Sequence, residues 1–380
     1  MSNPPRSSSE RISLEELLGL ADHRSLSRGW WWFPSPKSRR VAVPCDSRGW
    51  KPALNMVETP RKRALAAILL CSYRIMRRPP HLYAAAKNCP LDRWLAEVWP
   101  GVKLRYAIYR GTPNIFVKDS IQCQSIDGRV LGYVKVPRGL RACEAVANEA
   151  SALRTLADHF PDDEFYPRIL GSEWLATVQS AGPEAPQTNS LIAAGKVTGL
   201  LARKLSLDFC WQDSPEREEI VRAIAVIRTA DLTDRADRLA ESLAKLDAGL
   251  GDAVLPHPFS HGDLVPWNFS AGGFLFDWEW AAYRLPLHDA FHHLWMPHIL
   301  GRARLESSKL QSRWSEAAAA FTNATPQLCL PVLGLLSRAY LLWQSSFYDV
   351  ATLDHGDSVK GVRLLDRLHK LAASPPLPEG

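Results

Sequence analysis

The sequence predicts an α+β fold in which a small antiparallel sheet with one main helix precedes a larger, mostly helical part. Short apolar runs separated by turn residues occur between about residues 104 and 178. Beyond residue 190, apolar residues instead recur with the 3–4 spacing of helices. We therefore expect an N-terminal extension at 1–100, a sheet lobe at 101–185 and a helical lobe at 186–380.

Two segments of the N-terminal extension each allow two interpretations. Trp30-Trp31-Trp32-Phe33 is expected to cover a neighbouring part of the protein, because adjacent side chains point in different directions on any regular element; a ligand platform is the alternative. Residues 60–88 form a basic helical segment that is broken at Pro79-Pro80. A solvated basic face is the simpler interpretation of this segment, and docking on a membrane surface is the other.

The expected sheet contains one strong turn signal. Asp127-Gly128 separates a strand at Ile121–Ile126 from a strand at Val130–Val136 and predicts a hairpin. A helix is expected to follow at about 141–158, because the apolar residues there are spaced for one buried stripe. Further strands are predicted at Pro167–Leu170 and Trp174–Val178.

The helical lobe contains one region in which the pattern changes. Helices are predicted at 231–249, 327–347 and 358–372, and the first of them ends at Gly249 and Gly251. Between these helices, residues 268–277 read as a short strand pair that turns at Gly272-Gly273.

The overall composition limits the classes of protein to which the chain could belong. Hydrophobic residues make up 46% and charged residues 23%, which is the balance of a globular chain. The net charge of +6 suits an anionic ligand but is too small to argue for nucleic-acid binding. The seven cysteines are scattered without a CxxC pair, so a reducing cytoplasm is expected. No segment reads as a membrane helix or a secretory signal.

The densest group of chemically active residues runs from His261-Gly262-Asp263 to Asn268 and then to Asp277. The short strand pair should bring Asn268 and Asp277 to the same side. An amide oxygen and a carboxylate there form a pair suited to Mg²⁺, which takes few protein ligands and completes its shell with water and phosphates. Asp263 is placed to accept a proton from an attacking hydroxyl while the metal neutralises phosphate charge.

A second group of candidate residues lies in the sheet lobe. Lys135 is on a strand among apolar residues, and Glu149 is on the next helix. A buried charge needs a partner of opposite charge, and these two residues can pair with each other. The same lysine can then hold nucleotide phosphates. Gly111 and Thr112, in the first turn between strands, could cover those phosphates with backbone N–H groups.

These residues resemble the aminoglycoside phosphotransferase and choline kinase family, small-molecule kinases of the protein-kinase-like two-lobed fold. The resemblance rests on H-G-D-x-x-x-x-N followed by D-W-E, and it covers about residues 104–300. It implies that Asp263 is the catalytic base and that His261 braces the catalytic loop. It also implies that Asn268 and Asp277 are metal ligands, that Lys135 and Glu149 are the phosphate-binding pair, and that Asp289 is structural. Glu279 is either a further contact of the site or a surface carboxylate.

The function expected from these features is ATP- and Mg²⁺-dependent transfer of a phosphoryl group to a hydroxyl of a small molecule. An aminoglycoside, another sugar, an amino alcohol and a lipid-linked glycan remain open as acceptors. Residues 300–380 are not conspicuously acidic, which favours a neutral or anionic acceptor over a polycation. One alternative is a nucleotide-binding pseudokinase or interaction module without transferase activity. Another is a metal-dependent phosphohydrolase that uses His261, His288-Asp289, His292 and His293.

Overall fold

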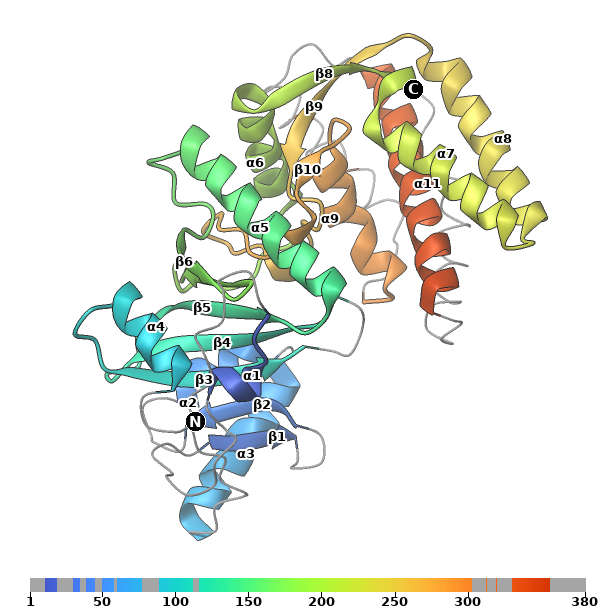
Figure 1. Cartoon of the computed structure of the whole chain (residues 1–380). Coiled ribbons are helices and arrows are strands. Elements are labelled where there is room, and N and C mark those ends of the chain that lie inside the picture. The colour runs from blue at the N-terminus through green and yellow to red at the C-terminus, as the bar shows by residue number, and fades with distance from the viewer. Residues whose placement is uncertain are drawn as a thin grey trace. The chain divides into compact units, whose positions relative to one another are not determined.

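The computed structural model describes residues 11–18, 30–34, 39–44, 50–57, 60–76, 89–111, 116–302 and 330–355, together with positions 312 and 319. The chain divides into two compact units, Met1–Pro183 and Glu184–Gly380. The first unit is built on a sheet and the second mainly from helices (Figure 1). This confirms the predicted α+β class with a sheet lobe and a helical lobe, while the finer division into three regions stays a prediction.

The strands described in the first unit form one antiparallel sheet in the order β1-β2-β3-β4-β5-β7-β6. They are β1 (Trp30–Pro34), β2 (Arg39–Pro44), β3 (Leu104–Arg110), β4 (Lys118–Ser125), β5 (Val130–Pro137), β6 (Ile169–Glu173) and β7 (Ala176–Ser180). The predicted hairpin at Asp127-Gly128 is confirmed, and Gly128 adopts φ +96° there. β1 and β2 come from the expected N-terminal extension, and β2 pairs with β3.

The β6–β7 hairpin begins later than the sequence predicts. β6 starts at Ile169 and β7 at Ala176, so each strand is shifted by two residues from its predicted start. Trp174 and Leu175 have positive φ values of 50° and 60°, which places them in the turn between the strands. The apolar character of these two residues therefore indicated a strand where the backbone forms a turn.

Helices lie against both faces of this sheet. They are α1 (Leu14–Leu17), α2 (Trp50–Ala53), the 3-10 helix η1 (Leu54–Met56), α3 (Pro60–Met76), α4 (Pro90–Val98) and α5 (Leu140–His159). Leu17 of α1 and Leu95 of α4 pack with Ile121 and Val134 in one apolar core. On the other side of the sheet, α2 and α3 pack in a second core that includes Val43 and Ala107. Residues 77–88 of the predicted basic segment lie outside the described residues.

The second unit combines helices with a small sheet. Its helices are α6 (Leu191–Lys204), α7 (Pro215–Thr229), α8 (Thr233–Leu250), α9 (His288–Ile299) and α11 (Leu330–His355), and α7, α8 and α11 lie side by side (Figure 1). The strands β8 (Ser206–Cys210), β9 (Val254–Ser260) and β10 (Ala282–Tyr283) form the sheet in the order β10-β9-β8. The sequence did not predict this sheet, and the predicted helix at 358–372 lies outside the described residues.

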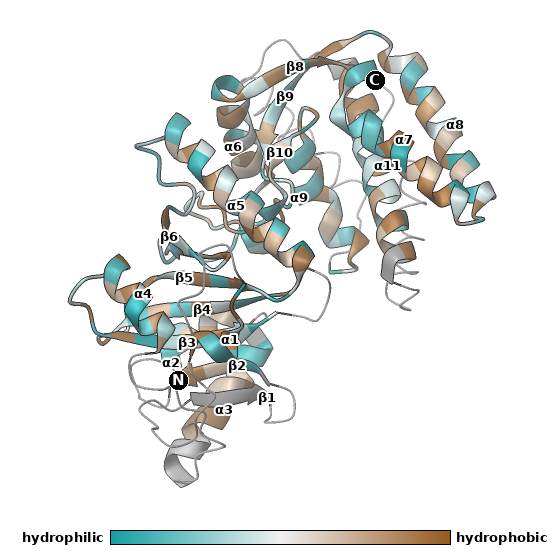
Figure 2. Ribbon diagram, viewed as in Figure 1, coloured by the Kyte–Doolittle hydropathy of each residue, from teal (hydrophilic) through white to brown (hydrophobic). Residues whose placement is uncertain are grey.

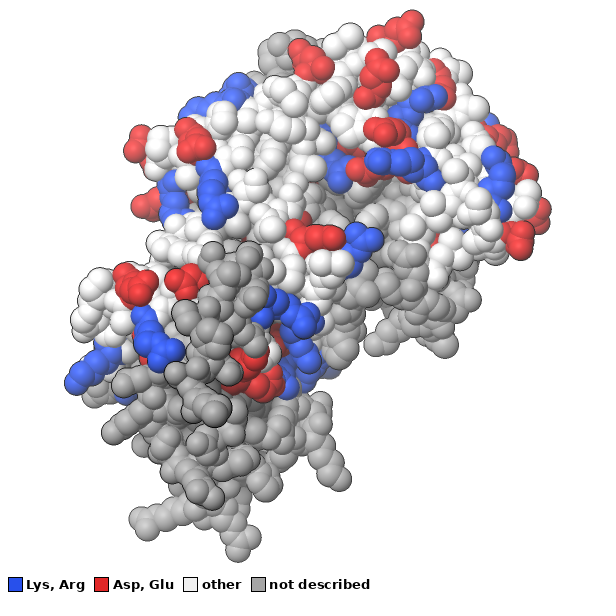
Figure 3. Space-filling view, in the orientation of Figure 1, with Lys and Arg blue, Asp and Glu red and all other residues white. Residues whose placement is uncertain are grey.

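Helix α8 illustrates how the pattern of the sequence produces the helical packing. Its apolar residues are buried at the predicted 3–4 spacing, and both hydrophilic and hydrophobic residues are seen along the helix (Figure 2). Lysine, arginine, aspartate and glutamate are mixed over α7 and α8 on the face shown in Figure 3. Among the helices of the described ranges, none is long and apolar enough to cross a membrane.

Candidate functional site

Lys135 and Glu149 form a buried ion pair inside the first unit. Lys135 lies on β5, and its Nζ is 2.5 Å from Oε1 of Glu149 on α5. Only 8% and 0% of the two side chains are exposed, so neither charge is hydrated by bulk water. This contact confirms the predicted pairing. The pair forms because leaving either charge buried alone would cost several kcal/mol.

The face of the sheet that carries Lys135 is polar along three strands. Lys135 is flanked in register by Ser120 of β4 and Thr177 of β7, and the next row along the strands consists of Gln122, Tyr133 and Gln179. Within that row, the Gln122 amide donates to the Tyr133 hydroxyl at 3.2 Å. The alternate residues of the same strands belong to the apolar core on the opposite face. Lys135 therefore lies in a largely buried polar strip.

Gly111 lies at the end of β3, where the chain turns towards β4. Its backbone N–H donates to the carbonyl oxygen of Lys118 at 3.1 Å. A Cβ at this position would approach that oxygen to 2.4 Å, so the close contact between the two backbone segments requires glycine. Thr112, which was predicted to act with Gly111, lies outside the described residues, and the phosphate-binding role of this turn stays a prediction.

In the second unit, the loop that follows β9 carries the His-Gly-Asp sequence and is fixed through its backbone. The carboxylate of Asp289, in the first turn of α9, accepts hydrogen bonds from the N–H groups of His261 at 2.7 Å and Gly262 at 2.9 Å. Burial raises the pKa of Asp289, and these two hydrogen bonds oppose the rise. Gly262 has φ +80°, and a Cβ there would meet the carbonyl oxygen of Trp280 at 2.1 Å. Only glycine fits this path of the chain.

The buried ring of His261 connects this loop to a segment further along the chain. Its Nε2 lies 2.6 Å from the carbonyl oxygen of Phe276, which can only accept, and its Nδ1 accepts from the Asp263 N–H at 3.2 Å. The ring is therefore neutral, with its proton on Nε2. Burial lowers the pKa of His261, which agrees with the neutral form.

Asp263 presents a carboxylate that is held at both oxygens and is still partly accessible. Oδ1 lies 2.9 Å from Nε2 of His292 on α9, and Oδ2 accepts from the side-chain amide of Asn268 at 3.0 Å. The side chain of Asp263 is 33% exposed, whereas that of His292 is 5% exposed. A reacting molecule can therefore approach a carboxylate whose orientation is already set by the protein.

Asn268 and Asp277 are brought together by a smaller structure than the predicted strand pair. Phe269 and Leu275 form an isolated bridge, and the N–H of Phe276 donates to the carbonyl oxygen of Asn268 at 3.0 Å. The prediction of two strands was wrong in extent. Asn268 is the last residue of the 3-10 helix η3 (Pro266–Asn268), so few residues are left to form a strand before the turn at Gly272-Gly273. The predicted proximity of the two backbone segments is confirmed.

The side-chain types at these positions are ones that Mg²⁺ takes from proteins. The Asn268 amide donates through Nδ2 to the backbone and carboxylate oxygens of Asp263, both at 3.0 Å, which leaves Oδ1 as its acceptor. Asp277 has φ +63°, a left-handed conformation that is uncommon for a residue other than glycine. In nucleotide sites Mg²⁺ takes only a few oxygen ligands from the protein, and carboxylate and amide oxygens are of this kind.

The phosphohydrolase alternative requires a different arrangement. Throughout the described ranges, no three or more histidine, cysteine, aspartate and glutamate side chains gather so that they could hold a metal ion. His261 and His292 instead bond to a carbonyl oxygen and to Asp263, respectively. Glu279 lies in the 3-10 helix η4 (Trp278–Trp280) directly after Asp277, and its role stays open between the two predicted alternatives.

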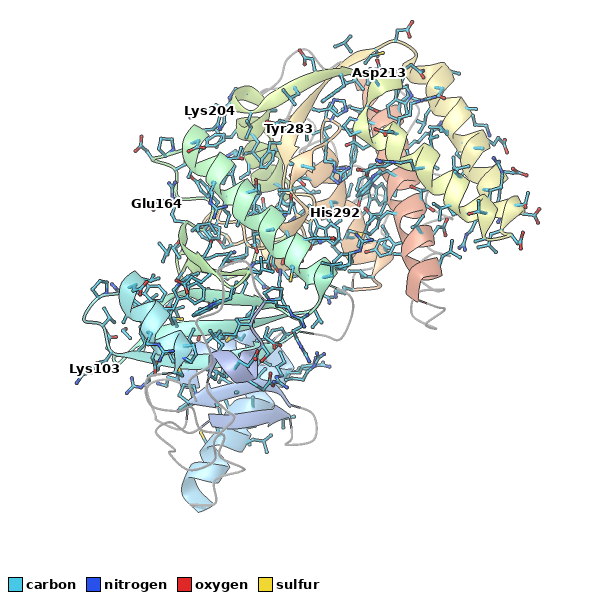
Figure 4. The ribbon with its side chains drawn as sticks, viewed as in Figure 1. Lys103, Glu164, Lys204, Asp213, Tyr283 and His292 are labelled. Carbon is cyan, nitrogen blue, oxygen red and sulfur yellow. The ribbon has the colours of Figure 1, made fainter. Side chains whose placement is uncertain are left out.

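Tyr340 was missed by the sequence reasoning, and His292 was named there only for the phosphohydrolase alternative. His292 contacts Asp263, and the hydroxyl of Tyr340, on α11, lies 3.1 Å from the other ring nitrogen of His292. His292 is labelled in Figure 4. Its spacing of three residues from Asp289 puts both on the same face of α9, which is the sequence signal that could have identified it. Nothing in the local sequence marks Tyr340.

Comparisons by sequence do not identify the protein. No protein-family model matches the chain, and no curated protein matches it.

Comparisons by structure do find similar proteins. An ethanolamine kinase of Plasmodium vivax matches with a TM-score of 0.53 and 12% identity, over 84% of this chain and 95% of that one. Choline kinase LicA from Streptococcus pneumoniae matches with a TM-score of 0.51 and 14% identity, over 75% of this chain and 99% of that one. The GDP and kanamycin complex of APH(2")-IIia matches with a TM-score of 0.51 and 13% identity, over 75% of this chain and 98% of that one. The chain therefore has the protein-kinase-like fold of these small-molecule kinases, as its motif implied.

Proposed function

We propose that this protein is a kinase that transfers the γ-phosphoryl group of ATP to a hydroxyl group of a small molecule. The observation that carries the proposal is Asp263, a partly exposed carboxylate oriented by Asn268 and His292 in a loop fixed by Asp289. A base in this setting suits phosphoryl transfer, in which catalysis consists mostly of positioning and electrostatic stabilisation. The shared fold with small-molecule kinases agrees with this reaction class.

In the proposed reaction Asp263 accepts the proton of the acceptor hydroxyl. The hydroxyl oxygen forms a bond to the γ-phosphorus, the bond from that phosphorus to the oxygen bridging to the β-phosphate breaks, and ADP leaves with the electron pair. The proton on Asp263 then passes to solvent. His261 and Asp289 act only by holding the loop in place.

The remaining candidate residues would bind the nucleotide and its metal. Asn268 and Asp277 would hold Mg²⁺, which supplies positive charge to the phosphates when it is bound. Lys135, paired with Glu149, would contact phosphate oxygens, and Gly111 with Thr112 would cover them. We propose a neutral or anionic acceptor, since the chain is basic, with a net charge of +6.

The first experiment is thermal unfolding of the wild type and of Asp277→Ala, with and without Mg²⁺ and ATP. A ligand at about 100 times its Kd adds about 2.7 kcal/mol of stability, which gives a measurable rise in Tm. The wild type should respond only when Mg²⁺ and ATP are both present, and Asp277→Ala should not respond. Asp234→Ala, which removes an exposed carboxylate of α8, is the matched control and should respond like the wild type.

A screen for ADP release then tests transfer itself, with sugars, amino alcohols, aminoglycosides and lipid-linked glycans as acceptors. Activity that depends on an acceptor, and that Asp263→Asn lowers by about 10²-fold or more, supports the proposal. Nucleotide binding without ADP release for any acceptor would instead favour the pseudokinase alternative. The absence of a Tm response in the wild type would contradict the nucleotide site.

A further inference from the structure

The hydrogen bonds around His292 identify Nε2 of its ring as a donor. The carboxylate of Asp263 can only accept, so Nε2 of His292, 2.9 Å from it, is the donor. When the ring is neutral, Nδ1 is its acceptor, and the hydroxyl of Tyr340, 3.1 Å away, is placed to donate to it. Burial raises the pKa of Tyr340 well above its usual value, so this hydroxyl stays protonated.

The resulting chain of hydrogen bonds joins three elements of the second unit. It runs from Tyr340 on α11 through His292 on α9 to Asp263 in the loop after β9. Tyr340 and His292 are both buried, so water does not compete strongly for either contact. The Asp263 carboxylate also accepts from Asn268 through its other oxygen, so its rotation is limited from two sides.

We propose that His292 is a positioning residue for Asp263, and that Tyr340 holds His292 in the tautomer that donates from Nε2. This inference rests on the proposed function, in which Asp263 receives the proton of the attacking hydroxyl. In this role His292 donates a hydrogen bond to Asp263 and takes no part in the proton transfer itself. Its contribution is to hold one carboxylate oxygen so that the other lone pairs of Asp263 are directed at the acceptor.

Three variants test the catalytic part of this proposal. His292→Phe keeps a ring but removes both hydrogen bonds, and it should lower kcat by about 10- to 100-fold with the KM for ATP changed less than about threefold. His292→Gln restores an N–H donor at similar reach and should recover much of that loss. Tyr340→Phe removes only the orienting hydroxyl and should lower kcat by about threefold to tenfold.

The matched control is His293→Phe, which changes a neighbouring buried histidine on α9 whose ring packs edge-on against Phe269 at 6.0 Å. It should leave kcat within about threefold of the wild type. If His292→Phe and His292→Gln lose activity equally, and only in proportion to a fall in Tm, His292 has a structural role and the proposal is overturned. An active wild type with an equally active His292→Phe would overturn it too.

A measurement that needs no catalysis tests the tautomer separately. In protein labelled with ¹⁵N-histidine, the His292 signals are identified by their loss in His292→Phe, and at pH 7 they should show the proton on Nε2. A proton on Nδ1 would overturn the proposal whatever the activity. If the wild type transfers phosphate to no acceptor, the proposed function fails and the positioning role fails with it, while this spectrum still shows whether the hydrogen-bond chain exists.

Discussion

At the scale of single residues, the Lys135–Glu149 pair shows how a buried charge depends on its partner. Removing one member leaves the other charge buried and uncompensated, which costs about 3–5 kcal/mol. We therefore expect Glu149→Gln to lower the free energy of unfolding by about 3 kcal/mol, as measured by urea denaturation. The same variant should weaken nucleotide binding if Lys135 contacts the phosphates.

A surface pair on the same helix provides the control for this prediction. Arg141 and Glu144 are 3.0 Å apart, but their side chains are 62% and 54% exposed. Glu144→Gln should therefore change the free energy of unfolding by no more than about 0.5 kcal/mol. Similar losses for Glu144→Gln and Glu149→Gln would show that burial of Lys135 and Glu149 does not determine the cost.

His288 gives a second prediction for a single residue, concerning pH. Neither of its ring nitrogens has a hydrogen-bond partner among the residues that the structure describes, and the ring packs edge-on against Tyr340 and Trp343 at 5.2 and 5.0 Å. Burial lowers the pKa of His288 well below its usual value, and the nearby Arg284 adds to the effect. Below the unfolded pKa of about 6.5, the unfolded chain therefore takes up a proton that the folded protein does not.

Stability should consequently fall as the pH falls from 7 to 5, by up to roughly 1 kcal/mol per pH unit for each such histidine. His288→Phe should make this fall shallower and raise stability at pH 7, because an apolar ring replaces one with unpaired polar atoms. Urea denaturation at several pH values measures both effects. His159→Phe, at an exposed histidine, is the control, and equal slopes for the two variants would contradict the argument.

At the scale of elements, the features predicted correctly from the sequence are those with a local cause. The turn at Asp127-Gly128 and the helix α8 follow from turn chemistry and from a 3–4 apolar spacing within a few residues. The strand β9 was missed because Pro256 and Pro258 interrupt it, and proline argues against a strand. β9 leads directly into the His261 loop, so the strand that supports this loop was not predicted.

The same distinction holds for the elements of the candidate site. Asp263 and Asn268 belong to one continuous motif, and their contact spans five residues. His292 lies 29 residues after Asp263, which it contacts, and Tyr340 lies a further 48 residues along the chain and contacts His292. Nothing in the local sequence marks Tyr340, and the signal for His292 is only its spacing of three residues from Asp289. The motif was therefore predicted in advance, whereas the contacts of His292 and Tyr340 were not.

At the scale of the whole molecule, the described segments of the first hundred residues take part in the core of the first unit. Leu14 and Leu17 of α1 and Leu91 and Leu95 of α4 are each 2% exposed or less, and they pack on the same core as Ile121. β2 also pairs with β3, which would otherwise be an edge strand. A segment built in this way is part of the fold to which Lys135 and Glu149 belong.

Removal of residues 1–100 should therefore destabilise the protein severely. Each buried leucine that is lost contributes about 2 kcal/mol, and the newly exposed core and the free edge of β3 favour aggregation. A chain that starts at Gly101 should unfold at a much lower temperature than the full chain or form aggregates, as shown by calorimetry and by size-exclusion chromatography. A chain that starts at Arg11 retains every described element and should behave like the full protein. If the chain starting at Gly101 stays monomeric and keeps the full-length Tm, the N-terminal strands and helices lie on the sheet without stabilising it.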